Sequence, residues 1–307
     1  MAEREPRSRR LRRAAAATRS GLRRYPRVLA QSVTKPALPL MGSSPAPLLG
    51  IHEHDPLAAS WLGHASVLLR QGGSTILLDP VFSRRIGMRF GPLVFGPHRL
   101  TPPIAPDRLP PIDLILISHA HFDHLDRPTL QALVSDRTNV VTARGTRRLI
   151  PRGFRHVIEL DWGKSLTVSG VRVCAHEPEH WGARAAVDRQ RGYNAYLIDS
   201  DNQRSFFSGD TASTESFTSI GGVDLAVFGI GAYDPWEHKH ATPEQVWSMF
   251  RAMNAGRLLP VHHSTFELSD EHIDEPMQRL LTAAGVEHPM VINTAQGKLW
   301  TPGSPEP

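Results

Sequence analysis

Short apolar runs recur along the chain, and most of them end in a polar residue that can bind a metal ion or an anion. Runs of about four to eight apolar and β-branched residues between turn residues predict strands. The runs with their polar ends are STILL before Asp79, LILIS before His119, VRVCA before His176 and His180, SFFSG before Asp210, and LLPV before His262. The segments ASVLLRQ and GYNAYLID predict two more strands, and DLAVFGIG predicts a strand buried on both faces.

Two segments between these runs carry helix signals. Residues 126–136 begin with Asp126, a residue type that caps helix N-termini. Residues 242–256 begin with Thr242 and have a glutamine three positions later, which is the pattern of a capping box. Helices interleaved with strands, with polar residues gathered at strand ends, predict a layered α/β body whose site lies at one edge of the sheets.

Positive charge is concentrated in the first 40 residues. Residues 1–40 contain eleven Arg or Lys and two Glu, a net charge of +9, so residues 41–307 carry −4 of the total of +5. This Arg-rich and Ala-rich composition favours a disordered arm, and a basic helix on an anionic membrane surface or a targeting peptide are the alternatives. Because the remainder is acidic, nucleic acid is not expected as a partner.

The rest of the chain divides into a linker and one folded domain. Residues 41–60 are rich in Pro, Gly and Ser and predict a linker, and residues 61–307 predict a single domain. Within the domain, residues 83–112 are rich in Pro and Gly and predict a long ordered loop that lines a pocket. One cysteine, Cys174, excludes an intrachain disulfide framework and fits a reducing compartment. We expect a cytoplasmic location, with peripheral contact at the inner membrane surface as an alternative.

A cluster of metal-binding residue types follows the LILIS run. Its members are His119, His121, Asp123 and His124, in the order HAHFDH. The two histidines before the turn leave the strand end on one side, and the turn brings the other two donors to a second position. Imidazole and carboxylate donors without a thiolate suit Zn²⁺, with Fe²⁺ or Mn²⁺ as alternatives.

Four donors are too few for two metal ions, so later strand ends must complete such a site. Candidates are His180, Asp210 and His262. The spacing alone also allows His176 in place of His180, and Asp210 can instead cap the turn that follows it.

The order of these motifs resembles the metallo-β-lactamase superfamily: HxHxDH, a distant histidine, SGDT and a C-terminal histidine. Within residues 60–280, the segments WLGHAS, LDPVFS, GPHRLTPP, EHWG, FFSGDT, IGAYDP and HHSTFELS resemble the phospholipases D that hydrolyse N-acyl-phosphatidylethanolamine. The branch of ascorbate-6-phosphate lactonases is similar as well. The resemblance implies an αββα sandwich in which two mixed sheets are flanked by helices.

The resemblance also implies two divalent metal ions. The first would be bound by His119, His121 and His180, the second by Asp123, His124 and His262, and Asp210 would bridge them. The family has one histidine where this chain has two, and His262 rather than His263 aligns with it. A Gln-His pair of the phospholipases lies near the scissile phosphate, and this chain has Lys239 and His240 there.

Two further residues are expected to support the ligands. Asp79 is placed to accept the second N–H of a ligand histidine, because metal-bound imidazoles usually have that N–H held. His64 is assigned the same supporting role, with a purely structural histidine as the alternative.

The sequence therefore predicts a dinuclear metal-dependent hydrolase of N-acyl-phosphatidylethanolamine or a related phosphodiester. A hydroxide shared by the metals would attack phosphorus, Asp123 would orient it, and His240 would stabilise the charge on the phosphoryl oxygens. A soluble lactonase or esterase on the same metal site is one alternative. A nucleic-acid-processing or non-enzymatic metal-binding module is another. The basic residues 1–40 favour contact with a membrane surface, and the sequence predicts no oligomeric state.

Overall fold

The computed structural model describes residues 7–34, 56–91, 93–184, 188, 190–200 and 202–303. The helices are α1 (Arg7–Thr34), α2 (Arg127–Ala132), α3 (Pro243–Ala252) and α4 (Glu275–Ala284), and the 3-10 turns are η1 (Pro106–Arg108), η2 (Arg147–Leu149) and η3 (Gly285–Met290). The strands are β1 (Leu57–Gly63), β2 (Ser66–Gln71), β3 (Ser74–Leu78), β4 (Met88–Phe90), β5 (Leu93–Phe95), β6 (Leu114–Ile117), β7 (Asn139–Ala143), β8 (His156–Leu160), β9 (Ser165–Val168), β10 (Val171–His176), β11 (Ala195–Ser200), β12 (Gln203–Phe207), β13 (Leu225–Gly229), β14 (Arg257–Val261) and β15 (Leu299–Trp300).

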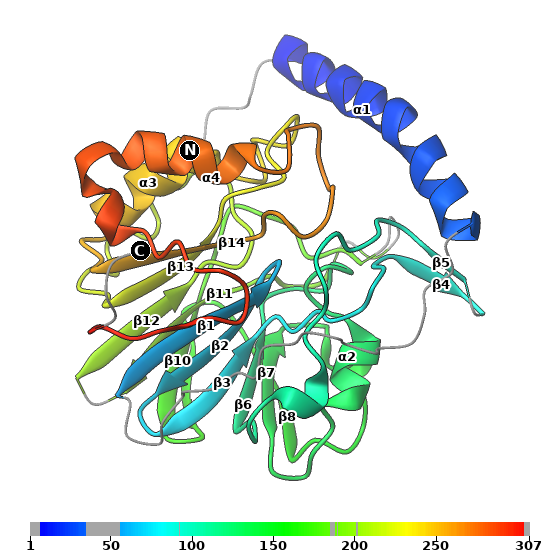
Figure 1. The fold of residues 1–307 in the computed structure, drawn as a ribbon. Coiled ribbons are helices and arrows are strands. Elements are labelled where there is room, and N and C mark those ends of the chain that lie inside the picture. The colour runs from blue at the N-terminus through cyan, green and yellow to red at the C-terminus, as the bar shows by residue number, and fades with distance from the viewer. Residues whose placement is uncertain are drawn as a thin grey trace.

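Two mixed sheets face each other, and helices lie outside them (Figure 1). The first sheet has the strand order β15-β1-β2-β3-β6-β7-β8, and the second has the order β14-β13-β12-β11-β10-β9. Each sheet combines antiparallel neighbours, such as β2 with β3 and β10 with β11, and parallel neighbours, such as β3 with β6 and β12 with β13. The αββα sandwich implied by the sequence is confirmed.

Apolar residues from both sheets form the central core. Leu69 and Ile76 of the first sheet lie in one buried cluster with Tyr196, Phe207 and Val227 of the second. On the outer face of the second sheet, α3 and α4 cover another apolar cluster. Burial of apolar area on both faces of a sheet accounts for the continuous apolar runs, as in β13, where the first four residues are buried.

The polar residues that follow the apolar runs are brought to one edge of the sandwich. The parallel strands β3 and β6 in one sheet and β12, β13 and β14 in the other run in the same direction within their sheets. Parallel strands of one sheet end at a common edge, where loops carry functional side chains in many α/β folds. Residues far apart in the sequence therefore meet there.

In the structure, the described N-terminal segment is a helix, an alternative to the disordered arm that its composition favoured. Residues 7–34 form α1, and its contacts attach it to the body. The hydroxyl of Ser20 donates to Asp270 at 2.9 Å, and Arg85 Nη2 donates to the carbonyl oxygen of Gln31 at 2.9 Å. A helix is favoured here because alanine and arginine are strong helix formers, so the composition that suggested disorder also supports a helix with a surface to pack against.

Two smaller expectations about boundaries change as well. The folded body begins with β1 at Leu57 instead of near Trp61, and the linker predicted for residues 41–60 lies mostly outside the described residues. The long loop predicted for residues 83–112 contains the β4–β5 hairpin and η1. Short strands of three residues leave little apolar periodicity to detect, which explains why the sequence pattern did not reveal them.

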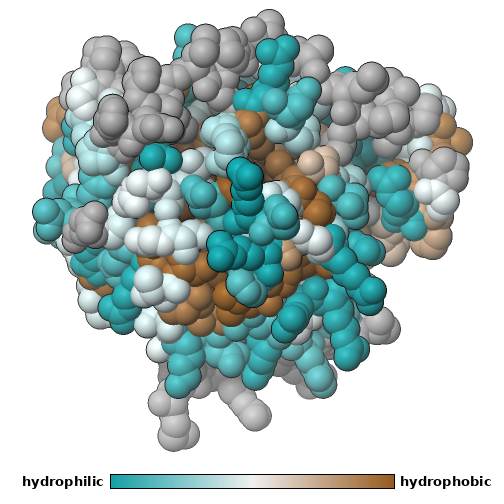
Figure 2. All heavy atoms as spheres, turned by 90° about the horizontal axis from the view of Figure 1, so that it is seen from below, coloured by the Kyte–Doolittle hydropathy of each residue, from teal (hydrophilic) through white to brown (hydrophobic). Residues whose placement is uncertain are grey.

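The outer surface differs from the apolar core but is not uniformly polar. Figure 2, which views the molecule from below, shows hydrophilic side chains projecting around a hydrophobic area near the centre of that face. Among the helices in the described ranges, none combines the length and the apolar composition that crossing a bilayer requires.

Candidate metal centre

Three histidines and one aspartate form a first group of potential ligands. Each of His119, His121, His180 and Asp210 offers one ligand atom, and these atoms lie within 4.8 Å of one another. His119 Nε2 lies 2.8 Å from His121 Nδ1, and His180 Nε2 lies 3.3 Å from the same atom. His119 and His121 follow β6, whereas His180 follows β10 of the other sheet. The facing sheets thus bring three imidazoles together.

A second group of potential ligands contains His64, Asp123, His124 and His262, again with ligand atoms within 4.8 Å of one another. Asp123 Oδ2 lies 3.1 Å from His64 Nε2 and 3.2 Å from His262 Nε2. His124 Nε2 is 3.7 Å from the same oxygen. The carboxylate of Asp123 is therefore surrounded by three imidazoles.

Asp210 stands between the two groups. Its Oδ2 atom lies 3.1 Å from His124 Nε2 and 3.6 Å from His180 Nε2. Its Oδ1 atom lies 3.4 Å from His262 Nε2. One carboxylate thus faces imidazoles of both groups, which is the position that a bridging ligand requires.

Polar contacts on the far side of the imidazoles fix their orientation. His124 Nδ1 lies 2.6 Å from Asp79 Oδ2, and His180 Nδ1 lies 3.0 Å from the carbonyl oxygen of Lys239. His119 Nδ1 lies 2.9 Å from the hydroxyl of Ser118. The backbone N–H of Ser118 in turn donates to Asp79 Oδ1 at 2.7 Å. Such contacts set the tautomer and the direction of a metal-binding imidazole.

These contacts test whether the residues fit a cation. A carbonyl oxygen only accepts, so the Nδ1 atom of His180 must carry the proton, and its Nε2 atom presents a lone pair to the centre. His124 Nδ1 contacts Asp79, and its Nε2 faces the carboxylate of Asp210. Burial lowers the pKa of His124, but the carboxylates of Asp210 and Asp123 outweigh it and raise the pKa well above its usual range, so this position favours a positive charge, which a metal ion would supply. Lone pairs and carboxylates that face one another repel, and a cation between them removes that repulsion. The donor set fits divalent metal ions.

The two central carboxylates are held in their charged form. Burial by itself raises the pKa of Asp210, but the surrounding imidazoles, His124 foremost, hold it well below its usual range. Burial likewise raises the pKa of Asp123, and the imidazoles of His124, His262 and His64 hold it well below its usual range. Ionised carboxylates are the form in which metal ions bind.

Several of the imidazoles are held in their neutral form. Burial and the neighbouring His262 lower the pKa of His64 to about 3. Burial lowers the pKa of His121 to about 4, although Asp123 and Asp210 oppose the shift. Burial also lowers the pKa values of His119 and His180 well below their usual range. Neutral imidazole is the form that binds a metal ion.

Backbone strain is concentrated around the centre. His64, Asp79 and His262 have φ angles of 51°, 35° and 61°. Such angles cost on the order of 1 to 3 kcal/mol for residues other than glycine and persist where the surroundings impose them. Here the N–H of His262 donates to the carbonyl oxygen of His64 at 2.9 Å, and the N–H of His64 donates to Thr265 Oγ1 at 2.7 Å. The strained backbone directs both imidazoles to the centre.

A glycine just before Asp210 allows the close approach of two site segments. Gly209 has a φ angle of +55°, and a Cβ atom there would lie 2.8 Å from Ser118 Cβ and 2.9 Å from the carbonyl oxygen of Asn194. Only glycine combines this backbone conformation with this close contact. The SGD sequence thus places Asp210 beside the strand end that carries His119.

An aromatic and a cationic side chain lie at the rim of the centre. The ring of Trp181, which is 37% exposed, has its centroid 4.7 Å from that of His121 and 4.4 Å from that of His180. Lys239 Nζ lies 5.8 Å from the Trp181 ring centroid, and the ring of His240 lies 5.1 Å from that of His180. His240 Nδ1 is 3.8 Å from Asp210 Oδ2. These groups border the centre on the side of His180.

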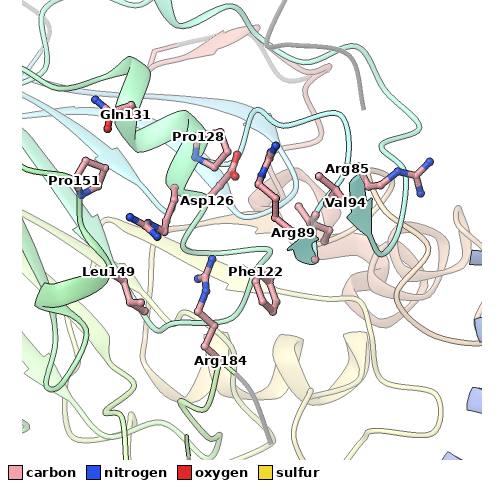
Figure 3. Close-up of a pocket in the computed structure, with 13 residues that line it drawn as sticks. Arg85, Arg89, Val94, Phe122, Asp126, Pro128, Gln131, Leu149, Pro151 and Arg184 are labelled. Carbon is pink, nitrogen blue, oxygen red and sulfur yellow. The ribbon is translucent and has the colours of Figure 1, made fainter. Parts of the chain in front are cut away.

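A cavity of about 410 Å³ lies next to the loop that carries the HxHxDH residues. Figure 3 shows that Phe122 of this loop, Arg89 of β4 and Arg184 line it. Arg184 Nη1 donates to the carbonyl oxygens of Ala120 and Leu125, both at 2.9 Å, and its guanidinium stacks over Phe122 at 4.2 Å. The Pro-rich and Gly-rich segment therefore contributes to a pocket, as expected from the sequence.

The structure distinguishes between the histidines that the sequence left as alternative metal ligands. His180 lies in the first group, whereas His176 does not belong to either group. His262 points to the centre, whereas the ring of His263 stacks on Trp61 with centroids 4.7 Å apart. His64 was expected to play a supporting or structural role, but it lies among the potential ligands themselves.

Comparisons with known proteins agree with this architecture. The β-lactamase superfamily domain matches residues 74–263. The chain belongs to the metallo-β-lactamase superfamily. An uncharacterized protein of Mycobacterium tuberculosis is 34% identical over 91% of this chain and 77% of its own length. The N-acyl-phosphatidylethanolamine-hydrolyzing phospholipase D 1 of Caenorhabditis elegans is 29% identical over 75% of this chain and 70% of its own length.

A solved structure shares the metallo-β-lactamase fold. A possible metal-dependent hydrolase from Veillonella parvula superposes with a TM-score of 0.65 at 14% identity, covering 80% of this chain and 99% of the other. The protein is thus a metal-dependent hydrolase of this superfamily, with His/Asp clusters suited to metal ions at the expected edge of the sandwich.

Proposed function

We propose that the protein is a dinuclear phosphodiesterase whose substrate is N-acyl-phosphatidylethanolamine or a related phospholipid. The observation that carries the dinuclear assignment is the position of Asp210, whose two oxygens face imidazoles of both ligand groups. The first ion is assigned to His119, His121 and His180, the second to Asp123, His124 and His262, and Asp210 is the shared ligand. Imidazole and carboxylate donors favour Zn²⁺, with Fe²⁺ or Mn²⁺ as alternatives.

The lipid substrate is supported by the relative in Caenorhabditis elegans, whose name states that it hydrolyses N-acyl-phosphatidylethanolamine. Hydrolysis would release phosphatidic acid and an N-acylethanolamine. A substrate of this kind lies in a membrane, so we assign peripheral membrane contact to residues 1–40.

Bound divalent ions would lower the pKa of a coordinated water and withdraw charge from the phosphoryl oxygens. The residues of the chain supply the remaining steps. Asp123 is held as a carboxylate by His64 and His262, so its oxygens can orient the attacking water and accept a hydrogen bond from it. The neutral imidazoles keep their lone pairs for ligation, and Asp79 holds His124 in the tautomer that this requires.

His240 would act as a neutral donor instead of a cation. Burial lowers its pKa to about 4, although Asp210 opposes the shift, so the imidazole is uncharged near neutral pH. An uncharged imidazole can still donate one N–H to a phosphoryl oxygen. The positive charge at the rim comes from Lys239, whose Nζ donates to the carbonyl oxygen of His180 at 3.3 Å.

The direct test is an activity assay of the metal-loaded enzyme against three substrate classes: N-acyl-phosphatidylethanolamine, a bis-aryl phosphodiester and a panel of lactones. We expect the phosphodiesters to be hydrolysed with the higher kcat/KM, because the rim presents one ammonium and one N–H donor for phosphoryl oxygens. Hydrolysis of lactones with phosphodiesters left intact would contradict the proposal and support a lactonase.

A matched pair of histidine variants controls for folding. His121→Ala removes a proposed ligand and should abolish activity, whereas His272→Ala changes a histidine whose side chain is 75% exposed and should leave activity unchanged. Equal activity of the two variants would contradict the assignment of the site.

A further inference from the structure

The outward face of α1 carries an apolar stripe that has no cover among the described residues. Leu22, Tyr25, Leu29 and Val33 are 74%, 66%, 49% and 62% exposed. Their spacing of three, four and four residues places them on one side of a helix. Isolated exposed apolar residues are common, but an aligned row of four marks an interaction surface.

The opposite side of α1 is already occupied by the protein itself. Ser20 is buried and donates to Asp270, and Arg24 donates to the carbonyl oxygens of Glu267 and Leu268. At the carboxyl end of the helix, Arg85 Nη1 donates to Ser32 Oγ at 3.2 Å. Because polar contacts at the middle and at the carboxyl end of α1 hold it to the body, the apolar stripe is not available for packing inward.

A row of arginines runs beside the stripe. Arg12, Arg19, Arg23 and Arg27 are exposed, and their spacing of seven, four and four residues aligns them on one flank of the helix. Arg23 also pairs with Asp270. An apolar face flanked by arginines is the arrangement of helices that lie in the plane of a membrane surface.

The β4–β5 hairpin extends this surface. Met88 and Phe90 are 51% and 60% exposed, and they point to the same face of β4 because strand residues alternate. The hairpin lies beside the carboxyl end of α1, where the backbone N–H of Gly96 donates to Ser32 Oγ at 3.3 Å (Figure 1). Six of the ten large apolar residues exposed in the described ranges therefore belong to α1 and β4.

We propose that α1 and the β4–β5 hairpin form one docking surface for an anionic lipid bilayer. Leu22, Leu29 and Phe90 would enter the interfacial region, and the arginine row would contact the charged headgroups. The test measures binding, so the proposal stands or falls separately from the substrate proposed above.

The chemistry of the surface favours a bilayer over two other occupants. Nucleic acid would use the arginines but would leave the apolar stripe in water. A second copy of the chain would bring two rows of arginine against each other, which costs free energy by repulsion of like charges. An anionic bilayer accommodates both the stripe and the row, since each Arg near such a surface contributes on the order of 1 kcal/mol.

The experiment is a sedimentation assay of the full chain with vesicles of phosphatidylcholine, with and without phosphatidylglycerol. We expect binding to the vesicles that contain phosphatidylglycerol. The double variant Arg19→Gln/Arg27→Gln should weaken that binding by roughly 10- to 30-fold. The double variant Leu22→Gln/Leu29→Gln should weaken it at both low and high salt, because apolar insertion is not screened by ions. Phe90→Ser should weaken it as well.

Matched controls lie elsewhere on the surface. Arg137→Gln/Arg155→Gln removes the same charge from exposed positions that line a separate hollow with Gly72 and Gly170, and Val286→Gln changes a residue that is 94% exposed on η3. Both should bind like the unmodified protein, and circular dichroism should show the same helix content in all variants.

Several results would overturn the proposal. The first is that the protein does not bind vesicles that contain phosphatidylglycerol. The second is that the control variants lose as much binding as the α1 variants, and the third is that the α1 variants bind as well as the unmodified protein. A dimer in analytical ultracentrifugation that becomes a monomer only in the leucine variant, without vesicle binding, would instead assign the face to a second copy. Binding of duplex DNA through Arg19 and Arg27, again without vesicle binding, would assign it to nucleic acid.

Discussion

At the scale of single residues, Asp79 shows how a group outside the ligand set can order the centre. It is fully buried, accepts from His124 Nδ1 at 2.6 Å, and accepts from the backbone N–H of Ser118 at 2.7 Å. Because Ser118 also contacts His119, one carboxylate orients imidazoles of both ligand groups.

Replacing Asp79 by asparagine should therefore weaken metal binding without removing any ligand. Asparagine keeps the shape but presents a neutral amide to His124, so we expect a loss of metal affinity of roughly 10- to 100-fold. Titration of the metal-free protein with Zn²⁺ measures this affinity. Asp136→Asn, at an exposed position, is the control, and an affinity for Asp79→Asn equal to that of the control would contradict the role given to Asp79.

Substituting Lys239 tests the role of its side chain alone, because every variant keeps the backbone carbonyl oxygen. Its carbonyl oxygen holds His180, and this contact survives any substitution, whereas its Nζ supplies the charge at the rim. We expect Lys239→Gln to retain bound metal and to lower kcat/KM for an anionic phosphodiester by about tenfold, an effect of about 1.4 kcal/mol. Hydrolysis of a neutral ester should change little. Lys298→Gln is the exposed control, and an equal loss on both substrates would refute a charge effect.

The sequence identified most of this residue set but not its full geometry. The motif HAHFDH and the later strand ends indicated seven potential ligands, because each lies just after a recognisable apolar run. The position of His64 among the potential ligands had no local signal, since its contact with Asp123 spans 59 positions. The carbonyl of Lys239 was missed for the same reason, because any residue type can supply it.

At the scale of elements, the turn after β12 shows how closely the segments of the site approach one another. Gly209 and Gly221 have similar φ angles of +55° and +49°, but only at Gly209 would a Cβ atom clash with neighbouring atoms. An alanine at Gly221 therefore measures the free-energy cost of the positive φ angle alone. An alanine at Gly209 measures that cost together with the cost of the steric clash.

We expect Gly221→Ala to lower the free energy of unfolding by about 1 kcal/mol, because alanine resists positive φ. Gly209→Ala should cost several kcal/mol more and should also lower metal binding, since Ser118 and Asp210 must move apart. Chemical denaturation with metal analysis measures both quantities. Equal destabilisation by the two variants would show that the turn does not depend on the close contact.

Elements with a strong local pattern were predictable, whereas the edge strands β8 and β9 were not. The helix beginning after Thr242 forms with the expected capping box to Gln245, and β13 is buried as its apolar run indicated. These two strands lie at the outer edges of their sheets and consist mostly of exposed and partly buried residues, so their apolar pattern is weak. For α1, the composition suited both disorder and a helix, and only the contacts with the body distinguish them.

At the scale of the whole molecule, the sandwich fold brings residues that are far apart in the sequence together in a single site. Residues that follow β3, β6, β10, β12 and β14 meet at one edge, although they span positions 79 to 262. The antiparallel and parallel pairings within each sheet fix which strand ends share that edge. The site therefore depends on the fold as a whole, and a partly folded chain should bind metal poorly.

The most direct measurement is the metal content of the carefully purified protein by elemental analysis, together with that of Asp210→Ala. The dinuclear assignment predicts about two tightly bound divalent ions per chain and a marked reduction in the variant, because Asp210 faces both ligand groups. Fewer than about one ion per chain in the unmodified protein, or an unchanged content in Asp210→Ala, would contradict the central claim.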